Sequence, residues 1–195
     1  IIYHRLEKRL SVQETMNLGI KKATGTFLTL ANVDDLRKDN HIEFLSKALS
    51  VDSSIDLVYS DCYETDNLCD SADEIQEGKL YEHSRYIFSK SNMIKCLPGP
   101  MPVWRANMHE KCGFFDEKYK YAGDWDLWLR AVKTGSRFKK IQKVLGIYYN
   151  NPNGLSTSAK NLVDKFKEEK EIFNKNKDVF GERNVKMFEG YFNER

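Results

Sequence analysis

The chain has 195 residues, 41% of them hydrophobic and 31% charged, and this composition excludes a disordered or low-complexity protein. Lys and Arg number 31 and Asp and Glu number 29, so a net charge of +2 provides no global field that would favour nucleic acid or an anionic membrane. No apolar run approaches the roughly 20 residues that a membrane-spanning helix needs. We therefore expect one main globular domain, no nucleic-acid partner and no transmembrane segment.

The four cysteines indicate a reducing environment. Cys62, Cys69, Cys96 and Cys112 lack the spacing of a structural zinc site or a redox pair. A chain of this size does not need a disulfide framework to fold. We therefore predict reduced thiols and a cytoplasmic protein, with the inner face of the membrane as a further place where it could act.

The first predicted elements are a helix and a strand. Residues 1–3 have the composition of a strand and do not begin with Met, so we expect part of the fold to lie upstream. Ser11 and Glu14 form a capping box that predicts the start of a helix, and Gly25 is expected to end that helix in a left-handed conformation. The apolar residues 27–31 then predict a buried strand, as in an α/β crossover.

An acidic cluster follows this strand directly. Asn32, Asp34 and Asp35 precede a predicted helix at 42–49 and a strand at 55–59. Ligands of open α/β sheets bind at the carboxyl ends of strands. Carboxylate and amide oxygens suit Mg²⁺ or Mn²⁺, which would hold a nucleotide diphosphate, while the alternative is that the two aspartates cap the next helix.

The rest of the chain divides at residue 158. Up to there we predict, in order, an exposed loop at 61–80, an extended proline-rich stretch at 97–102, a strand at 103–104, a helix from 123 to 132, a strand at 141–149 and a turn at 151–154. Beyond it, interleaved charges predict one or two solvated surface helices. We expect a domain over 1–158 and a helical C-terminal extension over 159–195.

The predicted helix at 123–132 carries two aspartates with different expected roles. Asp126 lies four residues before Arg130, so an i, i+4 salt bridge accounts for it. Asp124 has no such partner, and at the first turn of the helix it should stay ionised, as a carboxylate base requires. Its alternative role is a helix cap. Trp125 and Trp128 lie on the apolar stripe and are expected in the core.

Three segments together resemble a known family. They are SVQETMNLGIKKATGTFLTLANVDD at 11–35, PVWRANMHEKCGFFDEKYKYAGDWDLWLRAVKTG at 102–135 and IYYNNPNGLSTS at 147–158. The first is similar to a helix with an Asn-x-Gly step followed by a strand and an acidic metal motif. The second is similar to an acceptor-side segment with a Gly-x-Phe-Asp-Glu step and an acidic pair before a Trp-Leu-Arg helix. With the third, they resemble the family 2 glycosyltransferases of the GT-A fold over 1–158.

This resemblance implies a fold and a reaction. The fold would be α/β, a Rossmann-like GT-A arrangement with a mixed, mainly parallel sheet flanked by helices. The activity would be transfer of a sugar, with inversion, from a nucleotide-diphosphate donor such as a UDP-sugar to a hydroxyl of a glycan or lipid-linked acceptor. Mn²⁺ or Mg²⁺ would be the cofactor, and the pathway would be biosynthesis of a polysaccharide or of the cell envelope.

The resemblance also implies residue roles. Asp34 would be the principal metal ligand with Asp35 beside it, Asn32 would join them in donor binding, and Asp124 would be the catalytic base. The acceptor-side candidates are Trp104, Arg105, Trp125 and Asp126.

The chain departs from the family pattern at three places. Asn32 stands where an aspartate is common, and Asn150 and Asn151 stand where many members have an Arg or His that meets the diphosphate. The basic residues that could replace it are Arg105, Arg130 and Lys133. The family's first strands, which hold the nucleotide base, would precede residue 1, so we expect the chain alone to bind donor weakly or not at all.

Two other functions remain open at this stage. A metal-dependent nucleotidyltransferase with a related fold would release pyrophosphate instead of a nucleoside diphosphate. A truncated, non-catalytic GT-A-like domain would use its charged C-terminal helices to dock a partner, and Asn32 favours that alternative.

Overall fold

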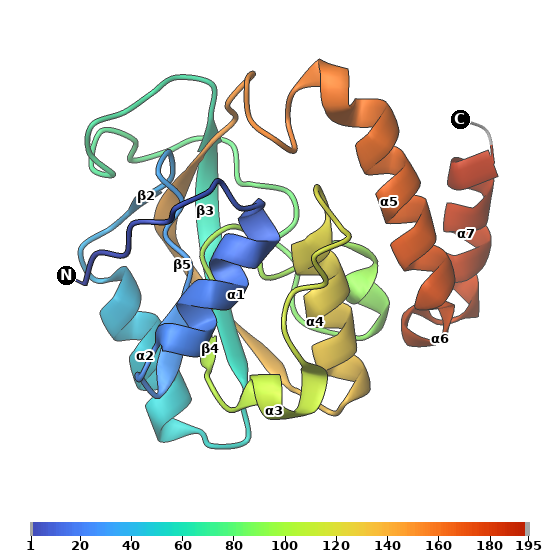
Figure 1. Cartoon of the computed structure of the whole chain (residues 1–195), viewed down its shortest axis with the longest axis horizontal. Helices are drawn as coiled ribbons and strands as arrows, with labels where there is room; N and C mark the ends of the chain where they lie inside the picture. The colour runs from blue at the N-terminus through green and yellow to red at the C-terminus, as the bar shows by residue number, and fades with distance from the viewer. Residues whose placement is uncertain (1, 194–195) are drawn as a thin grey trace.

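One five-stranded sheet organises the molecule, in the order β1-β4-β3-β5-β2. The computed structural model in Figure 1 describes residues 2–193, with helices packed on the sheet and the C-terminal helices at one side. The strands are β1 (Phe27–Thr29), β2 (Leu36–Arg37), β3 (Leu57–Thr65), β4 (Val103–Arg105) and β5 (Phe138–Tyr149). The predicted mixed α/β class is confirmed.

The pairing of the strands is less parallel than predicted. Only β3 and β5 are parallel neighbours, and the other three adjacent pairs are antiparallel. The reason is β4, which lies between β1 and β3 and runs against both, with Trp104 opposite Leu28 on one side and Leu57 on the other. The connection from β3 to β4 carries no α-helix that would return the chain for a parallel crossover.

The first helix begins as predicted but ends earlier. In α1 (Val12–Lys22) the Glu14 N–H donates to the Ser11 Oγ at 3.2 Å and the Ser11 N–H donates to the Glu14 carboxylate at 2.7 Å, which confirms the capping box. The Ala23 N–H closes the last turn on the Gly19 carbonyl at 3.0 Å. Ala23 is extended, so no left-handed residue is needed, and Gly25 does not adopt a positive φ.

The other helices are α2 (His41–Val51), α3 (Met108–Cys112), α4 (Gly123–Lys133), α5 (Leu162–Lys175), α6 (Lys177–Phe180) and α7 (Glu182–Asn193), with short 3-10 helices η1 (Ser91–Ile94) and η2 (Ala159–Asn161). Helices α2 and α4 lie where the sequence predicted them, α3 was not predicted, and the described part of the C-terminal extension forms three α-helices instead of the expected one or two. The strand expected at 1–3 is absent at Ile2 and Tyr3, and Ile1 lies outside the described residues.

Two loop predictions were wrong. The prolines at 98, 100 and 102 flank a turn instead of an extended stretch, because Gly99 has φ of +62° and its N–H donates to the Cys96 carbonyl at 3.1 Å. The segment from 61 belongs to β3 as far as Thr65, and Asp61 is buried there in an ion pair with Lys140 at 2.8 Å. The polarity of this segment argues against a buried strand, but a buried carboxylate is tolerated there when it is paired with a cation.

The C-terminal helices share the main core with α4. Trp125 of α4 stacks on Phe180 with ring centroids 6.0 Å apart, and Phe173 stacks on Phe180 at 5.6 Å. Trp125 and Trp128 are buried as predicted. The division at 158 stays a prediction, but the apolar faces of α5 and α6 belong to the same hydrophobic cluster as Trp104.

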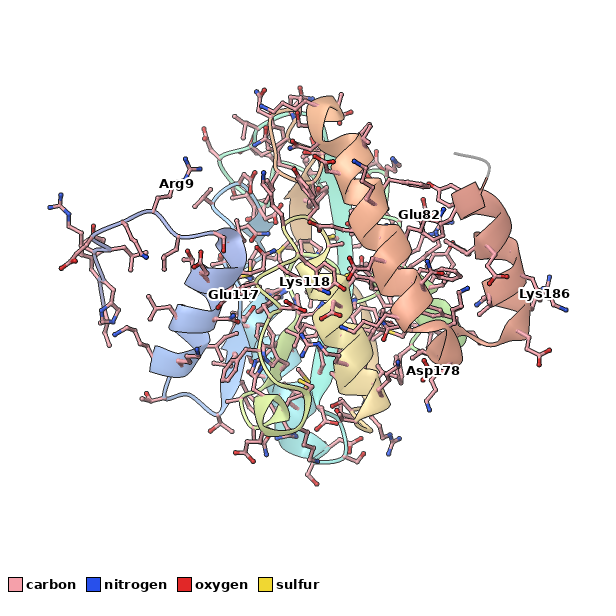
Figure 2. All side chains as sticks on the ribbon, turned by 45° about the vertical axis from the view of Figure 1, so that its right-hand side comes forward. Arg9, Glu82, Glu117, Lys118, Asp178 and Lys186 are labelled. Carbon is pink, nitrogen blue, oxygen red and sulfur yellow. The ribbon has the colours of Figure 1, made fainter. Side chains whose placement is uncertain are left out.

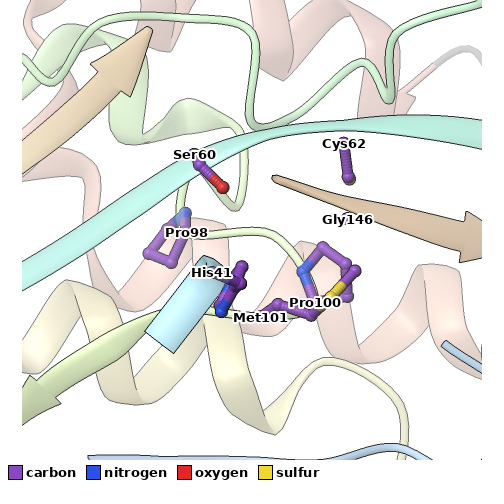
Figure 3. Close-up of a pocket in the computed structure, with 7 residues that line it drawn as sticks. All are labelled: His41, Ser60, Cys62, Pro98, Pro100, Met101 and Gly146. Atoms are coloured by element: carbon purple, nitrogen blue, oxygen red, sulfur yellow. The ribbon is translucent and has the colours of Figure 1, made fainter. Parts of the chain in front are cut away.

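A cavity of about 10 Å³, near the size of one water, lies behind the start of α2. Figure 3 shows His41 facing it together with Ser60, Cys62, Pro98, Pro100, Met101 and Gly146. Burial lowers the pKa of His41 to about 4, so this imidazole is neutral at pH 7. The space beside Gly146 is filled by Met101, whose sulfur would come within 2.8 Å of an added Cβ.

In residues 2–193, no helix has the length and hydrophobicity of a membrane span.

Candidate functional site

The acidic cluster lies on the turn between β1 and β2, which we call the acidic turn (residues 32–35). The Asn32 side-chain amide donates to Asp35 at 2.7 Å, and the Tyr149 N–H donates to the other Asp35 oxygen at 3.2 Å. The Asn151 side-chain amide donates to Asp34 at 3.2 Å. The structure therefore brings Asn32, Asp34 and Asp35 together and joins them to the end of β5.

Burial sets the electrostatics of this turn. Loss of hydration raises the pKa of Asp35, and the hydrogen bonds from Asn32 and Tyr149 oppose that rise. Arg37 of β2 is the nearby cation, and its guanidinium donates to the Thr29 hydroxyl at 3.2 Å. Burial lowers the pKa of Arg37, whereas Asp35 raises it. Sequence reasoning did not single out Arg37, because only the return of the chain from β1 to β2 places it there.

The donor set of the acidic turn fits Mg²⁺ or Mn²⁺ only in part. Within the described residues, no group of three or more His, Cys, Asp or Glu side chains could hold a metal ion. Mg²⁺ is usually held by one or two carboxylates together with waters and substrate phosphates. Asp34 and Asp35 match that minimal set, so the turn fits a metal shared with a bound diphosphate and not a closed protein cage.

Asp124 lies in the first turn of α4 and is exposed. One carboxylate oxygen accepts the N–H of the next residue, Trp125, at 2.8 Å, and because Ala122 is the N-cap residue of α4, Asp124 does not act as the helix cap. The other oxygen accepts the Cys96 thiol at 3.3 Å. The predicted alternative role as a helix cap is therefore not observed, and the exposed carboxylate is compatible with a role as a base.

Four side chains from distant segments interact electrostatically with Asp124. Burial is the main cause that raises the pKa of Tyr81, Cys96 and Glu169, and the negative charge of Asp124 raises each of them further. His83 is also close enough for Asp124 to act on its pKa, which burial lowers. No local sequence pattern links these positions, so they could not be found before the fold was known.

Two tyrosines in contact with each other link the acidic turn and Asp124 electrostatically. Tyr81 and Tyr148 contact each other with ring centroids 4.6 Å apart. Burial raises the pKa of Tyr148 to about 12, with Asp35 as the next cause, while Asp124 contributes to the raised pKa of Tyr81. The two acidic sites predicted from sequence thus belong to one connected region.

The tryptophans among the acceptor-side candidates are core residues. Trp104 has no exposed surface, and its indole N–H donates to the His109 Nε2 at 3.0 Å. Trp125 is 6% exposed, and its indole N–H donates to the Met93 carbonyl at 2.8 Å. Neither ring presents a face to solvent on which a sugar could stack.

The charged acceptor-side candidates also bind other parts of the protein. Asp126 is fully buried and contacts Arg130 at 2.7 Å, as predicted, and Lys175 of α5 at 3.0 Å. Arg105 donates to the carbonyls of Ile55 at 2.8 Å and Asp52 at 3.1 Å. Lys133 pairs with Asp178 at 2.8 Å. The basic residues expected to meet a diphosphate thus hold helices and loops together.

Two of the segments quoted above meet in space. Asn17, from the Asn-x-Gly step, donates its side-chain amide to the Phe115 carbonyl and accepts the Phe115 N–H, both at 2.9 Å. Phe115 belongs to the Gly-x-Phe-Asp-Glu step of the second segment. The Asn-x-Gly step and the Gly-x-Phe-Asp-Glu step, almost a hundred positions apart in the sequence, are therefore in direct contact, which joins α1 to the loop before α4.

The chain is similar to several curated proteins over most of its length. It is 28% identical to the uncharacterized glycosyltransferase YwdF of Bacillus subtilis over 160 residues, which cover 79% of this chain and 56% of that protein. It is 24% identical to a PGL/p-HBAD biosynthesis glycosyltransferase of Mycobacterium bovis over 166 residues, or 85% of this chain and 59% of that protein. The chain thus spans little more than half the length of these relatives. No protein-family profile matches it.

Solved structures share the fold at low sequence identity. TarS of S. aureus, solved with and without UDP, superposes with a TM-score of 0.58 at 12% identity and covers 84% of this chain and 45% of the TarS chain. The mannosyltransferase PcManGT of Pyrobaculum calidifontis, solved with GDP-Man and Mn²⁺, gives a TM-score of 0.54 at 16% identity and covers 83% of this chain and 44% of that one. The mixed sheet with its flanking helices is therefore a glycosyltransferase-like fold.

Proposed function

We propose that the chain is the greater part of the catalytic domain of an inverting, family 2 glycosyltransferase of the GT-A fold. The observation that carries this proposal is the link between the acidic turn and Asp124: the Tyr149 N–H donates to Asp35, the ring of the preceding Tyr148 contacts that of Tyr81, and Asp124 acts on the pKa of Tyr81. Similarity to proteins named glycosyltransferases supports the reaction class.

On the donor side, Asp34 and Asp35 would hold Mn²⁺ or Mg²⁺ together with the diphosphate of a nucleotide-sugar, and Asn32 would bind the donor beside them. Such a metal, when bound, neutralises charge that develops on the diphosphate leaving group. The neighbours solved with UDP and with GDP-Man and Mn²⁺ support this assignment. Among the possible donors we favour a UDP-sugar.

On the acceptor side, Asp124 would act as the general base. It would take the proton of an acceptor hydroxyl as that oxygen forms a bond to the anomeric carbon and the bond to the diphosphate oxygen breaks. Attack from the face opposite the diphosphate inverts the configuration. The acceptor would be a glycan or lipid-linked hydroxyl in polysaccharide or cell-envelope biosynthesis, and a cytoplasmic location would give access to the donor.

Thermal unfolding tests the donor site directly. A ligand that binds only the folded state raises the melting temperature by mass action. In a protein that contains this chain together with the remaining length found in its relatives, we expect UDP with Mn²⁺ to raise the melting temperature more than either alone. EDTA should abolish the effect and Asp34→Ala should remove it, whereas Asp124→Asn keeps it. A stabilisation that survives Asp34→Ala would contradict the assigned metal site.

A transfer assay tests the reaction in a protein that contains this chain together with the remaining length found in its relatives. We expect a nucleoside diphosphate as the released product and loss of transfer in Asp124→Asn, with UDP binding retained. Release of pyrophosphate would instead identify a nucleotidyltransferase. Equal loss of transfer and of UDP binding in Asp124→Asn would overturn its role as a base.

A further inference from the structure

The loop that leads into α4 lacks a cap of its own. Residues 113–122, which we call the α4 loop, end at Ala122, the N-cap position, and alanine offers no side-chain oxygen to the free backbone N–H groups there. Asp124 is the second residue of the helix, which begins at Gly123. The backbone N–H groups of residues 120–122, just before the helix, are bonded by a side chain from another element.

Helix α5 provides that group. One oxygen of the Glu168 carboxylate accepts the Lys120 N–H at 2.7 Å, and the other accepts the N–H groups of Tyr121 at 2.7 Å and Ala122 at 3.1 Å. Three consecutive backbone donors on one carboxylate form an anion-binding nest of charge-assisted hydrogen bonds. Glu168 thus fixes the backbone immediately before Asp124.

The neighbouring residue of α5, Glu169, interacts electrostatically with Asp124. Burial raises the pKa of Glu169, and the negative charge of Asp124 raises it further. The ammonium of Lys165, one turn earlier on α5, lies 3.9 Å from the Glu169 carboxylate. On the other side of the loop, the Gln13 side chain donates to the Lys120 carbonyl at 3.3 Å. Figure 2 shows Glu117 and Lys118 of the α4 loop between α1 and α5.

We propose that Glu168 is a positioning residue for Asp124: it holds the backbone of residues 120–122 so that the carboxylate at the start of α4 keeps its place. This inference rests on the proposed function only in taking Asp124 as the base. The contact between Glu168 and the backbone of residues 120–122 does not depend on it. It makes α5 a part of the site, although α5 lies in the predicted C-terminal extension.

Hydrogen exchange tests the contact without any ligand. Glu168→Gln keeps the size of the side chain but replaces one acceptor oxygen with a donor, so we expect the amides of 120–122 to exchange roughly 10- to 100-fold faster. The matched control is Glu171→Gln, one turn further along α5, because Glu171 contacts only the side chains of Lys118 and Tyr119. Unchanged exchange at 120–122 in Glu168→Gln would overturn the proposal.

The thiol of Cys96 reports the position of Asp124. It contacts the Asp124 carboxylate at 3.3 Å, and Glu169 and Lys165 are the other charged groups that face it. The pH profile of Cys96 alkylation by iodoacetamide, followed by peptide mass spectrometry, should shift to lower pH in Asp124→Asn, which removes the charge. We expect Glu168→Gln to shift it in the same direction, with about tenfold faster alkylation at pH 8, the equivalent of one pKa unit.

The outcomes separate the two proposals. A wild-type profile in Glu171→Gln together with a shifted one in Glu168→Gln supports positioning. A shift in Asp124→Asn without one in Glu168→Gln would overturn it, as would no shift in either variant. If Glu168→Gln does not fold, Glu168→Asp retains the charge on a shorter side chain and should give an intermediate shift, and an unshifted profile there overturns the proposal. Failure of UDP and Mn²⁺ to stabilise the chain would affect only the proposed function.

Discussion

The acidic turn carries the proposed metal ligands Asp34 and Asp35, and the α4 loop leads into α4, which carries Asp124, but the protein holds the turn and the loop in different ways. The acidic turn is tied to β5 by one backbone N–H and one side-chain amide. The α4 loop is held from both sides, by Gln13 and Asn17 of α1 and by Glu168 of α5. The proposed base, Asp124, is thus pre-organised, whereas the carboxylates of the turn are held by fewer contacts and a bound cation and diphosphate would supply the rest.

The largest effect should come from the α4 side of this comparison. Asp126→Ala removes a fully buried carboxylate that pairs with Arg130 and Lys175, so we expect the free energy of unfolding to fall by about 3–5 kcal/mol. Denaturation in urea measures the loss. Asp178→Ala is the control, because Asp178 is an exposed partner of Lys133 and its loss should cost less than about 1 kcal/mol. Similar losses in both variants would contradict this reading.

An intermediate effect is expected at the contact between α1 and the α4 loop. Asn17→Ala leaves the buried N–H and carbonyl of Phe115 without their partner, which should cost about 2–3 kcal/mol. Asn150→Ala removes an exposed side-chain hydrogen bond to Asp66 and should cost less than about 0.5 kcal/mol. If urea denaturation shows no difference between the two variants, the α4 loop does not depend on α1 for its place.

The smallest effect, and one of opposite sign, is expected at the acidic turn. The pKa of Asp35 is raised in the folded protein, so the unfolded state releases this proton at lower pH. The free energy of unfolding therefore falls as pH rises from 3.8, the usual pKa of an aspartate, through the raised pKa of Asp35 in the folded protein. Asp35→Asn should lack this contribution and lose no stability at pH 7. Urea denaturation between pH 4 and 7 measures the difference, and a large loss at pH 7 would show that the charge stabilises the turn.

Local patterns were sufficient for most of the elements, but not for β2, α3 or the site. The capping box at Ser11 and the Asp126–Arg130 pair involve residues three or four positions apart, so the sequence displays them. The contact between Glu168 and Lys120 joins positions 48 residues apart, and no periodicity points to it. The antiparallel place of β4 and the turn at Gly99 depend likewise on how distant segments meet.

The acidic turn also has a consequence for the order of folding. Its two aspartates are held by Tyr149 and Asn151, and Asp34 and Asn151 are 117 residues apart. Strand β2, which ends the turn, pairs only with β5 among the described strands. Contacts of such high sequence separation form slowly because the intervening chain must first be ordered. During synthesis on the ribosome, α1 and α2 can form early, but the turn acquires its native partners only after β5 has emerged.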